Sequence, residues 1–251
     1  MTPQVSAQPS SRQARGRIPL VQRVDYLLDA CRGRRVLHLG CTNWPYTDAA
    51  LGDGSLLHLR LREVASELHG LDADAEGLRR LADRGITHLH QGDLEALDRV
   101  PLDAAFDVIV AGEIIEHLAN PGRFLAGVRR LMRPGTSLVI TTVNAYCGFR
   151  MALYGLRGRG GRQEPVHPDH VAYYSYATLT HLVERAGLAV DEVSFYDLGR
   201  EHRSSTPSYV SWFNDALMRV MPHLADGLIV RCSLGSPPEQ SARPGARGAG
   251  A

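Results

Sequence analysis

The sequence contains no lysine, so arginine carries all 28 basic charges, and 27 acidic residues nearly balance them. The formal net charge of +1 leaves no basic footprint with which to bind a nucleic acid. The sequence also lacks a run of about 20 apolar residues, the length that a membrane-spanning helix needs. We therefore expect neither a nucleic-acid partner nor a membrane-embedded segment.

Cysteine is scarce, and the four cysteines are widely scattered without paired spacing: Cys31, Cys41, Cys147 and Cys232. This arrangement argues against a disulfide framework and against a cysteine metal site. Free thiols are typical of a reducing cytoplasm. Residues 1–16 have no apolar core of a secretory signal, so the sequence predicts a cytoplasmic protein.

The remaining composition, 44% hydrophobic and 22% charged, is that of an ordinary soluble globular protein. A length of 251 residues suffices for one α/β domain with short tails. Residues 1–16 and 236–251 are polar and rich in small residues, which predicts flexible tails. One domain is expected over residues 17–235, and within it residues 145–204 hold the longest loops and are interpreted as a substrate lid.

Helical and strand patterns alternate along this domain. Strands are predicted at residues 35–39, 66–72, 87–90, 105–110, 137–143, 188–195 and 227–233. Helices are predicted at residues 18–31, 56–64, 74–84, 120–131, 176–186 and 207–221. Strands separated by helices imply parallel βαβ units and a Rossmann-like, doubly wound α/β sheet. In such sheets a ligand binds beyond the carboxyl ends of the strands, so the residues that follow each strand are the candidates for function.

Small and acidic residues follow the first four predicted strands. Gly40 ends the first strand, where a glycine lets the backbone approach a ligand closely. Asp72 ends the second strand, in a position to accept hydrogen bonds from a ribose diol. Asp93 follows the third strand, where an acceptor could meet an adenine amino group. Residues 111–117, Ala-Gly-Glu-Ile-Ile-Glu-His, follow the fourth strand and bring two carboxylates and an imidazole beside the first loop.

The spacing of these segments resembles that of class I S-adenosylmethionine (SAM)-dependent methyltransferases, and most closely the methyltransferase-11/UbiG-like group. The segments that carry the resemblance are residues 36–40, 70–72, 92–93, 106–118, 131–135 and 170–175. The segment after the fourth strand, followed by Arg-Pro-Gly at residues 133–135, is the most specific of them. The resemblance implies seven strands in the order 3-2-1-4-5-7-6, numbered along the chain, with the last strand antiparallel.

The resemblance also implies a set of contacts with SAM. Gly40 and its turn would lie against the methionine part, Asp72 would hold the ribose hydroxyls, and Asp93 with Leu94 would flank the adenine. The residues expected to bind the cofactor are Gly40, Cys41, Thr42, Asp72, Ala73, Asp93, Leu94, Ala111, Gly112 and Glu113.

The chain departs from the family pattern at the methionine end of the expected site. His38 stands where the family usually has an acidic residue, and Thr42 and Trp44 stand where it usually has further glycines. We interpret His38, inside a predicted strand, as structural. An insertion at residues 45–56 follows, and we hypothesise that it folds over the cofactor in place of the missing contacts.

Histidine is the usual base when a methyl acceptor must lose a proton. His117, His167 and His170 are the candidate bases, because His117 follows the acidic segment and the other two follow the Gly/Arg-rich loop at residues 155–162. His-Pro-Asp-His at residues 167–170 lacks a third spaced ligand, so no metal is expected. Packing roles remain the alternative for each histidine.

The leading interpretation is an enzyme that transfers a methyl group from SAM to oxygen, nitrogen or carbon of a small metabolite, in natural-product biosynthesis. A non-catalytic partner or binding subunit with the same fold is the alternative, favoured by the altered first loop. A nicotinamide-dependent dehydrogenase is disfavoured, because the single glycine after the first strand lacks the G-x-G-x-x-G spacing.

Overall fold

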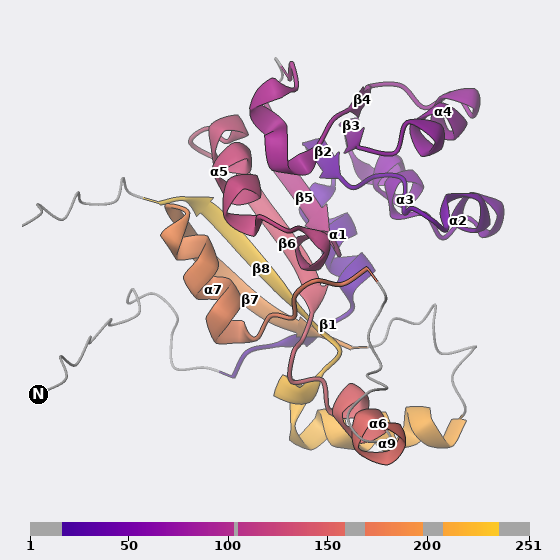
Figure 1. Cartoon of the computed structure of the whole chain (residues 1–251), viewed down its shortest axis with the longest axis vertical. Helices are drawn as coiled ribbons and strands as arrows, with labels where there is room; N and C mark the ends of the chain where they lie inside the picture. The colour runs from indigo at the N-terminus through magenta and orange to yellow at the C-terminus, as the bar shows by residue number, and fades with distance from the viewer. Residues whose placement is uncertain (1–16, 103–104, 159–168, 198–207, 236–251) are drawn as a thin grey trace, which may run out of the picture.

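In the computed structural model, residues 17–102, 105–158, 169–197 and 208–235 are described. Their centre is one eight-stranded sheet with the order β1-β7-β8-β6-β5-β2-β3-β4 (Figure 1). The strands are β1 (Leu20–Val21), β2 (Arg35–Leu39), β3 (Glu67–Asp72), β4 (Leu89–Gln91), β5 (Val108–Gly112), β6 (Ser137–Val143), β7 (Leu188–Tyr196) and β8 (Gly227–Leu234). β8 is antiparallel to both of its neighbours, and the other pairs are parallel.

The central strands are apolar on both faces because helices cover both faces. Leu37, Ile109 and Leu138 face one core cluster, and their chain neighbours Val36 and Val108 face the other. This alternation is the period-two pattern of side chains along a strand. It explains why the central strands appear in the sequence as short, uninterrupted apolar runs.

Helices pack on the two faces of the sheet (Figure 1). α5 (Pro121–Leu131) and α7 (Tyr176–Arg185) cover one face, through Phe124 and Leu179 among others. α1 (Arg23–Cys31) and α3 (Leu57–Val64) cover the other, through Leu27 and Leu61. The other helices within the described residues are α2 (Thr47–Asp53), α4 (Ala75–Asp83), α6 (Gly148–Arg157), α9 (Ser208–Val220) and the short 3-10 turns η1 (Leu94–Arg99), η2 (Ile115–His117) and η4 (Pro222–Leu224).

The seven expected strands are present in the expected order, but the sheet has an eighth strand that the sequence did not predict. The helix expected over residues 18–31 begins only at Arg23, and β1 precedes it. β1 pairs with the edge strand β7, and the Phe195 N–H donates to the Pro19 carbonyl at 2.8 Å. An edge strand offers unpaired backbone groups, and β1 pairs with them. The helical spacing of residues 18–31 could not reveal this short strand.

A second correction concerns α6, a helix that the sequence does not predict within the expected substrate lid at residues 145–204. Gly148 and Gly155 both lie in this helix. A Cβ at Gly148 would lie 3.0 Å from a Leu217 methyl group, so the glycine permits close packing against α9. Arg150 in α6 pairs with Asp226 at 2.8 Å. The expected loop at residues 155–162 therefore begins inside a helix, and residues 159–162 lie outside the described residues, as do the tails at 1–16 and 236–251.

Two strand boundaries also differ from the prediction. β4 starts at Leu89 rather than at residue 87, because His88 has a φ of +56°, which is incompatible with a strand. β5 runs from Val108 to Gly112 rather than over residues 105–110. The acidic segment therefore starts inside a strand.

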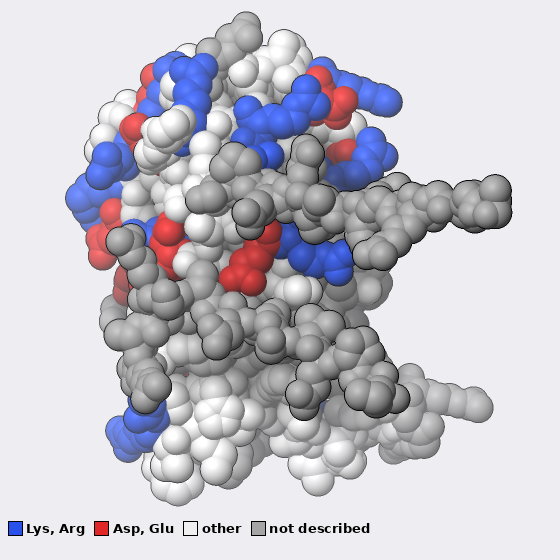
Figure 2. Space-filling view, turned by 90° about the vertical axis from the view of Figure 1, so that its left-hand side faces the viewer, with Lys and Arg blue, Asp and Glu red and all other residues white. Residues whose placement is uncertain are grey.

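Charged side chains of both signs are interspersed on the face shown in Figure 2, mainly over its upper part. This distribution matches the near-zero net charge. Among the described residues, no helix combines the length and the apolar character that crossing a membrane requires.

Candidate functional site

A cleft of about 610 Å³ lies at the carboxyl ends of β2 to β5. This size falls within the range of small-molecule sites, and its place is where α/β sheets bind ligands. The residues that line it are Arg23, His38, Gly40, Cys41, Asn43, Trp44, Tyr46, Ser55, Leu56, Leu57, Asp72, Ala73, Asp93, Leu94, Gly112, Glu113, Ile114, His117, Leu118, Asp169 and His170.

Eight of the ten residues expected to bind the cofactor line this cleft, and Thr42 and Ala111 do not. Ala111 is fully buried in β5, within the core. Thr42 is also buried and packs against α4, where a Cβ at Gly77 would lie 2.7 Å from the Thr42 Cβ. These two residues thus lie behind the wall of the cleft.

Gly40 opens the floor of the cleft at the end of β2. Its φ is +72°, a conformation that favours glycine. A Cβ at this position would collide with the side chain of Ile114. The backbone of the first loop therefore lies directly against the segment that follows β5, and only glycine fits between them.

Asp72 stands at the end of β3 and holds the first loop in place. Its Oδ2 accepts hydrogen bonds from the backbone N–H and the hydroxyl of Thr42, both at 2.9 Å. Its Oδ1 accepts from the Asp74 N–H at 3.0 Å. A carboxylate has about four lone-pair sites, so these three bonds leave acceptor capacity for a ligand in the cleft.

Asp93 occupies the equivalent position after β4. Its side chain accepts a hydrogen bond from the Glu95 N–H at 2.8 Å and caps η1. Leu94, the next residue, is largely buried and also lines the cleft. The pair therefore presents a carboxylate and an apolar surface side by side.

Glu113 lines the cleft after β5 in a strained backbone conformation, with φ at +54°. Non-glycine residues rarely adopt such values, and those that do cluster at functional sites. Its Oε1 accepts hydrogen bonds from Thr141 and from the Tyr196 hydroxyl, both at 2.8 Å. The Arg23 guanidinium lies 6.0 Å from the centre of the Tyr196 ring and lines the cleft beside Glu113.

Glu116 is fully buried beneath this end of the cleft. Burial and the nearby charge of Glu113 raise the pKa of Glu116 to about 8. Its Oε2 accepts a hydrogen bond from Thr142 at 2.9 Å. Its backbone carbonyl accepts from the N–H groups of Val171 and Ala172, at 2.9 and 3.2 Å, which ties η2 to the segment that carries His170.

His117 and His170 both line the cleft and meet edge to face, with ring centroids 4.6 Å apart. The Nδ1 of His117 lies 3.2 Å from the Asp169 carbonyl oxygen. His167, the third candidate base, lies outside the described residues. The site thus holds two imidazoles at one end of the cleft.

Donor atoms of Glu116, His117 and His170 lie within 4.8 Å of one another, so this group could hold a metal ion. The expectation of no metal assumed that residues 167–170 had no third ligand nearby. The fold supplies further donors from η2, which is about fifty residues away in the sequence, and spacing within one segment could not reveal this.

His38 lines the methionine end of the expected site but is itself buried. Its Nδ1 lies 3.2 Å from the Nδ1 of His58. Burial, followed by the positive charge that His58 and Arg23 would contribute, lowers the pKa of His38 well below its usual value. A neutral imidazole pair therefore occupies the position where the family usually has a carboxylate.

The insertion at residues 45–56 contains α2 and returns to the cleft at both of its ends. Tyr46, Ser55 and Leu56 line the cleft, as does Trp44 just before the insertion. Trp44 and Tyr46 are 65% and 57% exposed, so their rings stand at the rim with apolar surface available to a ligand. The sequence did not single out Tyr46, Arg23 or Asp169 for the site, because only the fold brings them to it.

Comparisons with known proteins agree with this geometry. A family model described as a methyltransferase domain matches residues 13–193. A Mycolicibacterium smegmatis protein named "probable S-adenosylmethionine-dependent methyltransferase" is 31% identical over 168 residues, which cover 66% of this chain and 56% of that protein. A ubiquinone biosynthesis O-methyltransferase of Burkholderia thailandensis is 23% identical and is matched over 72% of this chain and 76% of its own length.

The fold is also that of solved methyltransferases. The crystal structure of a SAM-dependent methyltransferase from Mesorhizobium loti superposes with a TM-score of 0.53 at 16% identity, covering 84% of this chain and 95% of that one. The chain therefore belongs to the methyltransferase domain family, whose cofactor is SAM. The match spans little more than half the length of the M. smegmatis relative.

Proposed function

We propose that the protein transfers the methyl group of SAM to a small-molecule acceptor that binds at the His117–His170 end of the cleft. The observation that carries this proposal is the meeting of Gly40, Asp72, Asp93 and Glu113 around one cleft at the carboxyl ends of four neighbouring strands. Each of these residues follows a different strand, as nucleotide-type ligands require in α/β sheets.

The residues around the cleft fit the parts of SAM. Gly40 offers a backbone surface without a Cβ to the methionine part. Asp72 keeps acceptor capacity for the ribose hydroxyls after its three bonds within the protein. Asp93 and Leu94 offer an acceptor and an apolar surface to the adenine. Arg23, which also lines the cleft, adds a positive charge that would pair with the cofactor's carboxylate.

When bound, SAM supplies a methyl group on a sulfonium, which is already activated for an in-line displacement. The protein then needs mainly to orient the acceptor and exclude water. Trp44 and Tyr46 at the rim would cover the cofactor. His117 or His170 would take the proton that a hydroxyl or amine acceptor loses as its bond to the methyl carbon forms.

Similarity to a protein named as an O-methyltransferase supports a hydroxyl oxygen as the first acceptor atom to test. Nitrogen and carbon acceptors, and a place in natural-product biosynthesis, belong to the same proposal. We also place the protein in the cytoplasm, because all four cysteines are buried free thiols.

The test is product formation, measured as S-adenosylhomocysteine (SAH) released from SAM with a panel of phenol, amine and carbon-acid acceptors. Turnover that depends on one acceptor class supports the proposal. Folded protein that binds SAM but turns over no acceptor would favour the alternative, a non-catalytic partner subunit. The neutral His38–His58 pair in place of a carboxylate is the observation that keeps this alternative open.

A further inference from the structure

A second group of metal-ligating side chains lies at the opposite end of β3 and β4 from the cleft. Glu67 starts β3, His69 follows two residues later, and His88 directly precedes β4. Donor atoms of these three side chains all lie within 4.8 Å of one another. We propose that Glu67, His69 and His88 form a site for a divalent transition-metal ion, with Zn²⁺ as the best fit.

The sheet register explains why these residues meet. Residues two apart on a strand point to the same face, so Glu67 and His69 share one face of β3. His90 lies on the neighbouring strand β4, and His88 directly precedes that strand. β3 and β4 are parallel neighbours, with Gly70 opposite Leu89 and Leu71 opposite His90. Adjacent strands lie about 4.8 Å apart, so four side chains gather on one face of this edge.

Contacts within the group already orient His69 for a metal. Its Nε2 lies 2.7 Å from the Glu67 carboxylate, and its Nδ1 lies 3.1 Å from the Nε2 of His90. A metal-binding histidine usually bonds through one ring nitrogen while the other N–H donates to a neighbour. His90 would be that neighbour once an ion is bound. The Nδ1–H of His69 would then donate to the Nε2 of His90, and the ion would replace the contact between the His69 Nε2 and the Glu67 carboxylate.

His88 is held against His69 in an uncommon backbone conformation. Its φ is +56°, and its carbonyl accepts a hydrogen bond from the Gly70 N–H at 2.9 Å. The His88 and His69 rings stack with centroids 4.6 Å apart. Strained conformations of this kind persist where the surroundings determine them and are frequent at ligand sites.

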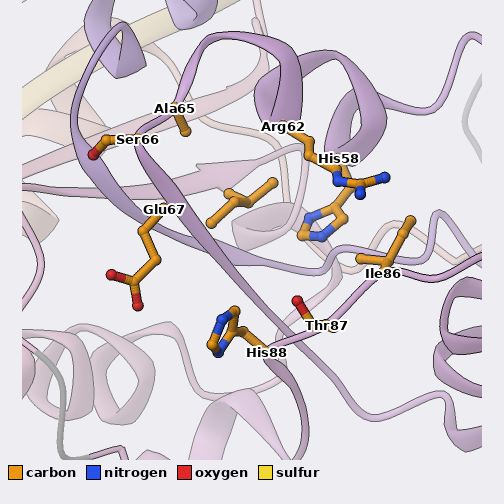
Figure 3. Close-up of a pocket in the computed structure, with 9 residues that line it drawn as sticks. His58, Arg62, Ala65, Ser66, Glu67, Ile86, Thr87 and His88 are labelled. Carbon is orange, nitrogen blue, oxygen red and sulfur yellow. The ribbon is translucent and has the colours of Figure 1, made fainter.

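Solvent can reach the group through a hollow of about 220 Å³ that Ser66, Glu67, Thr87 and His88 line together with other residues. Figure 3 shows Glu67 and His88 projecting toward the same side of this hollow. Two histidines and one glutamate with an open fourth position are a ligand set that Zn²⁺ uses in proteins. The exposed His88 side chain would coordinate the ion, and water would occupy the fourth coordination position.

Two arginines oppose a cation here. Arg35 pairs with the Glu67 carboxylate at 2.8 Å, and Arg62 lines the hollow. Both positive charges should therefore lower the affinity of the group for a divalent cation.

Titration of metal-free protein with Co²⁺, followed by its visible absorption, and with Zn²⁺, followed by calorimetry, tests the site. His88→Asn removes a ligand while asparagine tolerates a positive φ, and we expect its metal affinity to fall by more than about 100-fold. His90→Asn should lower the affinity by about 10- to 100-fold. Arg35→Gln should raise it, a gain that misfolding cannot produce. His181→Asn, at an exposed position in α7, is the matched control and should bind as the wild type does.

The experiment must distinguish metal binding at this site from metal binding at the Glu116–His117–His170 group. Co²⁺ binding that survives in the double variant His117→Asn/His170→Asn and disappears in His88→Asn supports the proposal. Binding that disappears in the double variant and survives in His88→Asn would overturn it, as would the absence of stoichiometric binding to the folded wild type. Neither readout depends on methyl transfer.

Discussion

The two ends of the cleft are built in different ways. At the Asp72–Asp93 end, each carboxylate bonds to residues close by in the sequence, at Asp74 and Glu95, and Asp72 also holds the neighbouring loop through Thr42.

At the Glu113–His170 end, the contacts join distant segments. Glu113 meets Tyr196, which is 83 residues away, and His117 meets Asp169, which is 52 residues away. The first end thus combines local turns with one contact between neighbouring loops, and the second depends on packing between segments more than 50 residues apart. Variants at the two ends should therefore separate cofactor binding from acceptor chemistry.

The largest expected effect is on turnover. His117→Asn/His170→Asn should lower kcat by about 10²- to 10⁴-fold, because it removes both imidazoles that could take the acceptor's proton. The affinity for SAM should change by less than about threefold, since the Asp72–Asp93 end is untouched. Steady-state kinetics together with calorimetric binding measure both quantities, and equal losses in both would remove the distinction between the two ends.

Asp72→Ala should act on the affinity for SAM. It removes charge-assisted hydrogen bonds worth about 2–3 kcal/mol to the ligand, so the Kd for SAM should rise by about 100-fold. Thr42→Val is the matched control, since it removes one bond to the Asp72 carboxylate but leaves the carboxylate in place. It should weaken binding by less than about tenfold. If both variants bind equally weakly, Asp72 acts by holding the loop and not by touching the cofactor.

Glu116 should make stability depend on pH. Its pKa is raised from 4.5 to about 8 in the folded protein, so its contribution is present below about pH 4.5 and is lost as pH rises through 8. Glu116→Gln mimics the protonated form and should flatten this dependence, so that Tm falls by several degrees less between pH 5 and pH 9 than in the wild type. Thermal unfolding at pH 5, 7 and 9 checks it, and parallel curves for the two proteins would refute the assignment.

The smallest expected effect is at Gly40. Gly40→Ala should destabilise the fold by about 1–3 kcal/mol, because the backbone is strained for alanine and the Cβ meets Ile114. Gly33→Ala is the control, with a φ of +67° and no atom within 4 Å of the added Cβ. It should cost about 1 kcal/mol from the backbone alone. Urea unfolding gives the loss of unfolding free energy in each variant, and the difference between the two losses is the cost of the contact with Ile114. Equal losses would show that the Ile114 side chain moves aside at no cost.

Much of the sheet could be predicted from the sequence because its central strands are buried on both faces and appear as apolar runs that end in glycine or aspartate. β1 was missed because two residues added to an edge strand leave no periodicity. α6 was missed because Gly148 is required for packing against Leu217, a contact between segments that the sequence does not connect.

The same reasoning explains which site residues were found. Gly40, Asp72 and Asp93 follow strands and could be located by position alone. Arg23, Tyr196 and Asp169 approach Glu113 and His117 only after the chain has folded, and no local pattern marks them. Thr42 and Ala111 have the right positions in the sequence but point into the protein. The alternation of side chains along β5 turns Ala111 into the core, and the Thr42 side chain bonds to Asp72 and packs against α4.

The most direct measurement is calorimetric titration of the folded wild-type protein with SAM and with SAH. The account predicts one site per chain with micromolar affinity for both ligands, despite the neutral His38–His58 pair at the methionine end. Absence of binding to either ligand would mean that the cleft no longer serves the family's cofactor, and would contradict the proposed methyl transfer.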